Sequence, residues 1–287
     1  MDFPTAPSRR SLMMRRLFIL AGAMFIGLII AGSLAIMLGN DTTPRVRVIT
    51  ILQDMLVFIL PAVGTAMMSS RLPARWLSVD RGFPIWALVA AVLLMVVSVP
   101  LQNFVIRWNE ALTLPDFLIS LERWMADAQL RADRSLELLA GGSTVADLVM
   151  GLLIVGVFAA LSEELFFRGA FQRIISDGSG NAHAAIWIGA IVFSAFHLQF
   201  YGFVPRLLLG ALFGYLVWWS GSLWLPVTVH ALNNSVVVVS QWLSRRTGTD
   251  SVIDTIGANS AWMVTASAVL TAVALWLIHR SCAGRRQ

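Results

Sequence analysis

The feature that most constrains the fold of this chain is a series of long apolar runs separated by short polar links. A transmembrane helix needs about 20 mostly apolar residues, and eight stretches approach or reach that length. Hydrophobic residues make up 57% of the chain and charged residues only 13%, about half the charged share of a soluble domain. We therefore predict an all-α polytopic membrane protein, a bundle of about eight transmembrane helices. They cover 17–38, 48–68, 83–101, 148–169, 183–200, 207–220, 223–243 and 261–279.

The basic residues are all arginine, and most of them lie in the links between apolar runs. Cytoplasmic links of membrane proteins are enriched in basic residues, so this placement predicts that both termini are cytoplasmic. Membrane topology accounts for the net charge of +5, and we infer no nucleic-acid partner. The arginine-only composition and the short chain favour a bacterial inner-membrane protein whose surroundings are lipid.

One link is long, and its apolar residues recur at helical spacing, with charged residues between them. This pattern predicts either an amphipathic helix on the outer membrane surface or a small excursion packed on the outer helix ends. The single cysteine, Cys282, excludes an intrachain disulfide. The chain then divides into a basic cytoplasmic N-terminus (1–16), three spans (17–101), the extracytoplasmic link (102–146), a core with polar residues in its helices (147–243), and a last span with a cytoplasmic tail (244–287).

The first group of polar residues in an apolar run is Ser162-Glu163-Glu164-Leu165-Phe166-Phe167-Arg168-Gly169. Glu164 and Arg168 are four residues apart and share a helix face, which predicts a structural ion pair. Glu163 points about 100° away and has no cation among its helical neighbours. A charge at membrane depth is costly, so Glu163 needs a partner from another helix. Alternatively, both acids mark the water-facing end of a span.

Two further groups lie in later runs. Phe193-Ser194-Ala195-Phe196-His197 ends the fifth span, and His230-Ala231-Leu232-Asn233-Asn234 lies in the seventh. His230 and Asn234 share one helix face, so both should face the interior of the bundle. His183 and His279 are interpreted as interfacial residues outside the site.

Brought into one cavity, Glu163, His197, His230 and Asn234 would suit peptide hydrolysis. A carboxylate and an imidazole can hold and deprotonate a water, while a second His and an Asn amide can donate to the developing oxyanion. The same residues allow a second mechanism, because Glu163, His197 and His230 form a two-His, one-carboxylate set for a catalytic Zn²⁺. The residues alone do not separate the two mechanisms.

Together, Glu163-Glu164-x-x-x-Arg168, Phe193-x-x-x-His197 and His230-x-x-x-Asn234 resemble the CPBP family, which comprises type II CAAX prenyl proteases and bacteriocin-processing intramembrane proteases. The resemblance covers roughly 145–240. It implies an eight-helix bundle with a conical cavity open to the cytoplasm. It also implies that Glu163 and His197 activate water, that His230 and Asn234 form the oxyanion hole, and that Glu164, Arg168 and Phe193 support the site. The family is described both as metal-dependent and as glutamate-type.

From the resemblance we expect an intramembrane endopeptidase acting on a membrane-associated protein or peptide. Whether that substrate is prenylated stays open, because bacterial members of the family have varied targets. The alternative is a non-catalytic membrane scaffold or a bacteriocin self-immunity factor of the same fold. A transporter is disfavoured because no inverted repeat is visible.

Overall fold

The computed structural model describes residues 8–39, 42–140, 142–249 and 253–283, and every regular element in those ranges is helical. The α-helices are α1 (Arg9–Leu38), α2 (Thr43–Asp54), α3 (Leu60–Ser69), α4 (Pro73–Trp76), α5 (Ile85–Val97), α6 (Val99–Glu110), α7 (Ile119–Ala140), α8 (Val145–Gly151), α9 (Ala159–Glu164), α10 (Arg173–Ser179), α11 (Ala182–Phe196), α12 (Phe203–Ser220), α13 (Trp224–Thr247) and α14 (Ala261–Ser281). Three short 3₁₀ helices are η2 (Asp116–Leu118), η5 (Phe200–Gly202) and η6 (Ile253–Thr255).

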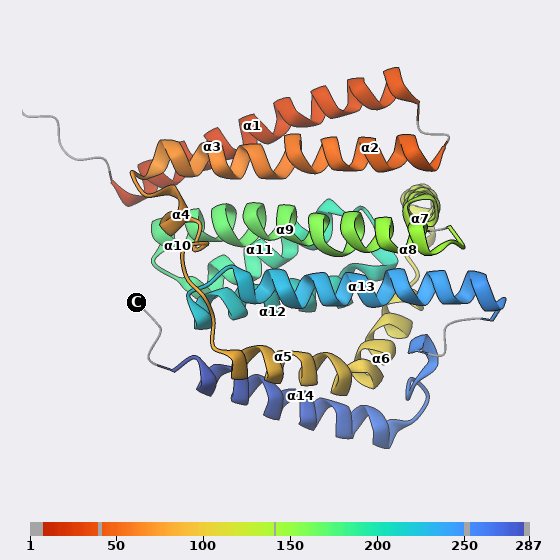
Figure 1. Ribbon diagram of the computed structural model, residues 1–287. Coiled ribbons are helices and arrows are strands. Elements are labelled where there is room, and N and C mark those ends of the chain that lie inside the picture. The colour runs from red at the N-terminus through yellow and green to blue at the C-terminus, as the bar shows by residue number, and fades with distance from the viewer. Residues whose placement is uncertain (1–7, 40–41, 141, 250–252, 284–287) are drawn as a thin grey trace, which may run out of the picture.

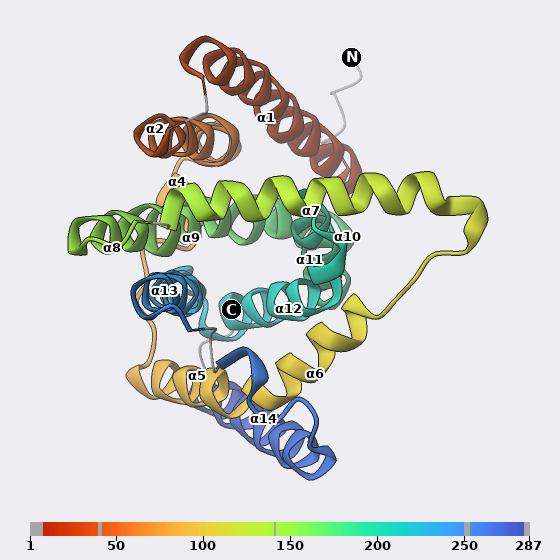
Figure 2. The same cartoon turned by 90° about the vertical axis from the view of Figure 1, so that its right-hand side faces the viewer.

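Most of these helices run side by side in layers (Figure 1). The α1 helix and the α2–α3 helix form one outer layer, and α5, α6 and α14 form the opposite one. Between them lie the helix that runs from α8 to α10, the pair α11 and α12, and α13 (Figures 1 and 2). The three groups of polar residues predicted to form the site therefore belong to the middle of the bundle.

The prediction of an all-α polytopic membrane protein is confirmed. Within the described residues, five helices are long and apolar enough to cross a membrane, namely Arg9–Leu38, Thr43–Ser69, Val145–Ser179, Phe200–Ser220 and Ala261–Ser281. The predicted span 83–101 is not straight, because α5 and α6 meet at a bend of 53°. Pro100 lies in the first turn of α6, where its missing N–H starts a new helix rather than continuing the old one. This bent pair would make a sixth span.

The exact count of eight spans is not confirmed. The predicted span 183–200 forms only the 15-residue helix α11, which is apolar but shorter than a usual span. The predicted span 223–243 forms α13, which is 24 residues long but is not among the five helices that are long and apolar enough to cross a membrane. The first predicted polar group lies in a longer helix than expected, since the helix containing 148–169 extends from Val145 to Ser179.

Two of the spans contain π-helical segments, in which the backbone hydrogen bonds widen from i→i−4 to i→i−5. They are η1 (Met55–Ile59), η3 (Leu152–Phe158) and η4 (Leu165–Gln172). Segments of this kind are rare and occur often at functional sites. Here η1 begins directly after Asp54 and η4 directly after Glu164, so both segments adjoin buried acids.

The long link forms α7, which crosses the other helices at one end of the bundle (Figure 2). It contacts α2, α8 and α13, and a salt bridge of 2.7 Å joins Glu137 to Arg245 of α13. Trp124 of α7 packs on Phe200 with ring centroids 5.5 Å apart. The segment is therefore a structured helix against the bundle end, and its position at the outer membrane surface stays a prediction.

An aromatic cluster packs around the helix that holds the two acids. Phe166 and Phe167 pack against Phe58 of η1, and Phe167 packs edge-on against Phe193 of α11 with centroids 5.2 Å apart. Edge-to-face contacts of this kind favour one relative orientation of the rings. They fix α11 and the α2–α3 helix against η4, which sets the positions of the polar groups described next.

Candidate active site

The ion pair predicted from spacing is formed and buried. Arg168 Nη1 donates to Glu164 Oε1 at 2.6 Å, and Arg168 Nη2 donates to the Gly210 carbonyl at 3.1 Å. Arg168 is 4% exposed and Glu164 is fully buried. The guanidinium also lies 4.3 Å from the centre of the Phe193 ring, a cation–π distance. Glu164, Arg168 and Phe193 therefore form one contact network that joins η4, α11 and α12.

His230 is held by Glu164. Its Nδ1 lies 2.9 Å from Glu164 Oε1, a hydrogen bond in which the carboxylate accepts. The His230 ring stacks on Phe213 with centroids 4.7 Å apart and planes inclined by 21°. A carboxylate on one ring nitrogen fixes the tautomer and orientation of a histidine. The other nitrogen, Nε2, is then the one available for chemistry.

Glu163 faces that free nitrogen. Its Oε2 lies 3.8 Å from His230 Nε2, and among the described protein atoms Oε2 has no hydrogen-bond partner although it is buried. A buried oxygen without a partner is unusual in a native structure. At this separation the two atoms do not form a direct hydrogen bond.

His197 ends α11 and donates from Nδ1 to the Phe193 carbonyl at 2.9 Å. This contact leaves Nε2 as the acceptor nitrogen of a neutral ring. His197 lies close enough to Glu163, His230 and Arg206 to interact with them electrostatically. The predicted catalytic residues Glu163, His197 and His230 are thus gathered in one region of the bundle interior.

Asn234 lies one turn beyond His230 on α13, and its Nδ2 donates to the Val155 carbonyl of η3 at 3.1 Å. An amide NH₂ has two hydrogens, so one hydrogen remains for another acceptor. The Val155 bond ties α13 to the helix that bears Glu163, a role that the sequence pattern did not predict.

Four participants could not be foreseen from the motifs. Asp54 of α2 interacts with Glu163 and Ser162, Phe213 stacks on His230, the Gly210 carbonyl accepts from Arg168, and Arg206 interacts with His197. Of these four participants, Asp54 alone could have been noticed in the sequence, because it is an acid inside an apolar run and belongs to none of the three motifs.

The zinc set predicted as the alternative was Glu163, His197 and His230. In the described part of the chain, no group of three or more His, Cys, Asp or Glu side chains converges as metal ligands. The Nδ1 contacts of His230 with Glu164 and of His197 with a carbonyl leave both Nε2 atoms free, so what speaks against zinc is that the described side chains do not converge as a ligand set. The residues in this arrangement do not fit a zinc ion, and we derive no step through one.

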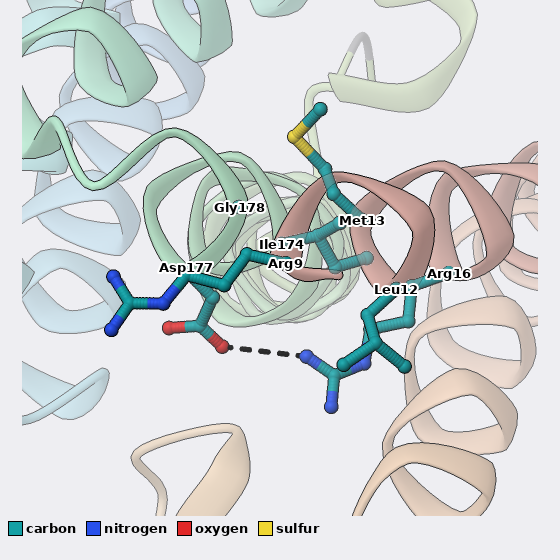
Figure 3. Close-up of a pocket in the computed structure, with 7 residues that line it drawn as sticks. All are labelled: Arg9, Leu12, Met13, Arg16, Ile174, Asp177 and Gly178. Atoms are coloured by element: carbon teal, nitrogen blue, oxygen red, sulfur yellow. Dashed lines mark ion pairs between the residues drawn. The ribbon is translucent and has the colours of Figure 1, made fainter. Parts of the chain in front are cut away.

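A pocket of about 160 Å³ lies away from these residues, between the start of α1 and the end of α10 (Figure 3). In it, Asp177 forms a 3.6 Å ion pair with Arg16. None of the predicted site residues lines this pocket. The predicted conical cavity open to the cytoplasm is a different feature and stays a prediction.

Comparisons with known proteins agree with the motifs. Residues 145–236 match the model of the Rce1-like family, described as type II CAAX prenyl endopeptidase Rce1-like. A segment is 25% identical over 89 residues to the uncharacterized protein YpbD of Bacillus subtilis (strain 168). That match covers 30% of this chain and 42% of the relative, so the chain spans less than half the length of that protein. No solved structure is a significant match.

These matches confirm the resemblance to the CPBP family predicted from the motifs. The matched segment contains Glu163, Glu164, Arg168, His197, His230 and Asn234. It supports the fold of a CAAX-type intramembrane protease in a multi-pass membrane protein.

Proposed function

We propose that this chain is an intramembrane endopeptidase that hydrolyses a peptide bond in a membrane-associated protein or peptide. The observation that carries the proposal is the row Glu164, His230 and Glu163, in which one buried acid orients an imidazole toward a second acid. Structural ion pairing accounts for Glu164 and Arg168 but not for the free oxygen of Glu163. A carboxylate beside an oriented histidine, in a low-dielectric interior, suits general-base chemistry.

In the proposed reaction Glu163, together with His197, takes a proton from a water whose oxygen attacks the scissile carbonyl carbon. The carbonyl oxygen gains the negative charge, which the second N–H of Asn234 stabilises, together with His230 Nε2–H in the form of the ring that carries a proton on both nitrogens. The C–N bond then breaks and the leaving nitrogen receives the proton that Glu163 took from the water. The products are a carboxylic acid and an amine, so atoms and charge balance.

The proposed substrate reaches the site from the membrane, because the site residues lie in helices surrounded by apolar spans. Lipids are thus its immediate surroundings, and the family description favours a prenylated CAAX-type protein as one substrate of this class. We place the protein in a bacterial inner membrane with both termini cytoplasmic, on the arginine distribution.

The proposal is tested with purified protein in lipid vesicles and a set of lipid-anchored peptides, prenylated and not. Wild type should cleave, while Glu163→Ala and His197→Ala should be folded and inactive, with losses of several orders of magnitude. Cleavage by Glu163→Ala at the wild-type rate would exclude the mechanism. A protein that cleaves nothing but protects cells from a bacteriocin would instead be the scaffold or immunity factor.

A further inference from the structure

We propose that the pocket between the start of α1 and the end of α10 binds the phosphate group of an anionic phospholipid. The pocket has a volume of about 160 Å³, which is room for several water molecules and therefore for a phosphate group. None of the predicted catalytic residues lines it, so the inference stands independently of the proposed function.

The lining of the pocket combines charged and apolar side chains. The charged ones are Arg9, Arg16 and Asp177, and the apolar ones are Leu12, Met13 and Ile174. Arg9 and Arg16 are seven residues apart, about two helical turns, so they lie on the same face of α1. Leu12 and Met13 lie between them on that face. A ligand with an anionic group beside an apolar chain matches this lining better than a free ion does.

The charged groups at the pocket are mostly positive. The Asp177 carboxylate lies 3.6 Å from Arg16 and 3.8 Å from Arg173, so one acid is shared by two guanidinium groups. Arg9 takes part in none of the ion pairs of the described residues. In the view of Figure 3, the guanidinium groups of Arg9 and Arg16 lie on either side of the Asp177 carboxylate. The three arginines therefore exceed the single acid, and an anion would balance the excess.

Two of these guanidinium groups are held in place by the fold. Arg16 lies 5.9 Å from the centre of the Trp76 ring and donates a long hydrogen bond of 3.5 Å to the Ser69 carbonyl. Arg173 lies 5.6 Å from the centre of the same ring and donates to the Trp76 carbonyl at 2.6 Å. Side chains that are ordered before binding lose less entropy when the ligand arrives. The cluster is thus preorganised for an anion.

The depth of the pocket favours a lipid as the source of the phosphate. The apolar run 17–38 begins directly after Arg16 and rises about 30 Å as a helix, which is the thickness of the hydrocarbon core. Arg16 therefore lies at the level of the lipid headgroups. The end of α10 lies at the same level, because Met13 packs so closely on Gly178 that a Cβ there would have no space. Basic residues next to a span attract anionic lipids.

Membrane topology is the alternative explanation for these arginines, since basic residues are enriched in cytoplasmic links. Topology requires only that the charges lie at this end of the chain, and it applies equally to Arg10 and Arg15. Both of these are exposed and neither lines the pocket. Arg10 is the neighbour of Arg9, carries the same charge and points about 100° away from it. It is therefore the matched control for a specific site.

The test uses the full-length protein in detergent and native mass spectrometry to count bound molecules. The protein is titrated with a short-chain phosphatidylglycerol, with phosphatidylcholine of the same chain length, and with inorganic phosphate. Wild type should bind one phosphatidylglycerol about tenfold more tightly than phosphatidylcholine, which is zwitterionic. Arg9→Gln should weaken this binding about fivefold, the effect of one cation near the membrane surface, and Arg10→Gln should leave it nearly unchanged.

Asp177→Asn gives a second, opposite readout. It removes the acid that competes with the phosphate for Arg16, so it should tighten the binding of phosphatidylglycerol, whereas a purely structural role of Asp177 would not. Equal weakening in Arg9→Gln and Arg10→Gln, or equal affinities for the two lipids, would overturn the proposal. Binding of inorganic phosphate as tight as that of phosphatidylglycerol would identify a free anion as the ligand and overturn the assignment to a lipid.

Discussion

Glu164 makes two contacts with a single oxygen, one to Arg168 and one to His230. The first contact follows from spacing, because both residues lie on one helix and four residues apart. The second joins residues 66 positions apart, and no local pattern predicts which histidine an acid will meet. The sequence motifs therefore identified the pair correctly but assigned Glu164 only half of its role.

Removal of either member of this pair should destabilise the protein. In Glu164→Ala the guanidinium of Arg168 loses its counter-charge, and in Arg168→Ala the carboxylate of Glu164 does. Loss of one partner of a buried ion pair costs about 3–5 kcal/mol. Thermal unfolding in detergent should show an unfolding temperature well below that of the wild type for both variants.

Glu163→Ala is the matched control, since it removes the neighbouring acid, whose Oε2 has no hydrogen-bond partner among the described atoms. Its unfolding temperature should stay near that of the wild type. Equal unfolding temperatures for Glu164→Ala and Glu163→Ala would show that the ion pair does not hold the helices together.

The helix pair formed by η4 and α12 depends on two glycines four residues apart. Arg168 donates to the Gly210 carbonyl and Gln172 to the Gly214 carbonyl, so two side chains one turn apart bind two carbonyls one turn apart. Small residues let membrane helices approach closely. A Cβ at Gly214 would lie 2.7 Å from Gln172 Oε1 and 2.9 Å from Ile186, which leaves no space for one.

Gly214→Ala should therefore lower the unfolding temperature, with a cost of about 1–3 kcal/mol for overpacking. Gly64→Ala is the control, because Gly64 is also inside a helix but no atom of another part of the described chain lies within 4 Å of the position that a Cβ would take there. That substitution should be neutral or stabilising by up to about 1 kcal/mol, from helix propensity. An equal decrease of the unfolding temperature in Gly214→Ala and Gly64→Ala would argue against close packing at Gly214.

At the scale of helices, the apolar runs predicted the existence of most membrane helices. They did not predict the bend between α5 and α6 or the π-helical segments. The bend between α5 and α6 was not expected because Leu101, Val99 and their neighbours continue the apolar run across Pro100. The π-helical segments were not predicted, because their mostly apolar residues continue the runs of the α-helical segments on either side of them.

The orientation of the whole molecule follows from the arginine distribution and can be measured. Arg75, in the link between α3 and α5, is predicted to be cytoplasmic, and Arg131 of α7 to be extracytoplasmic; both are exposed. In a Cys282→Ser background, Arg131→Cys should react with a membrane-impermeant maleimide on intact cells. Arg75→Cys should react only after permeabilisation, and the opposite pattern would invert the topology.

The central claim, that Glu163 supports peptide hydrolysis inside the membrane, is tested most directly in the source cell. Membranes of a deletion strain, complemented with wild type or with Glu163→Ala at equal protein levels, are compared by mass spectrometry of peptide termini. We predict that the strain with wild type contains new termini in membrane-associated proteins that are absent with Glu163→Ala. The residue before each cut then shows whether the substrate is lipidated at that position. Identical termini in the two strains, with both restoring a phenotype lost on deletion, would contradict the claim and favour a scaffold or immunity role.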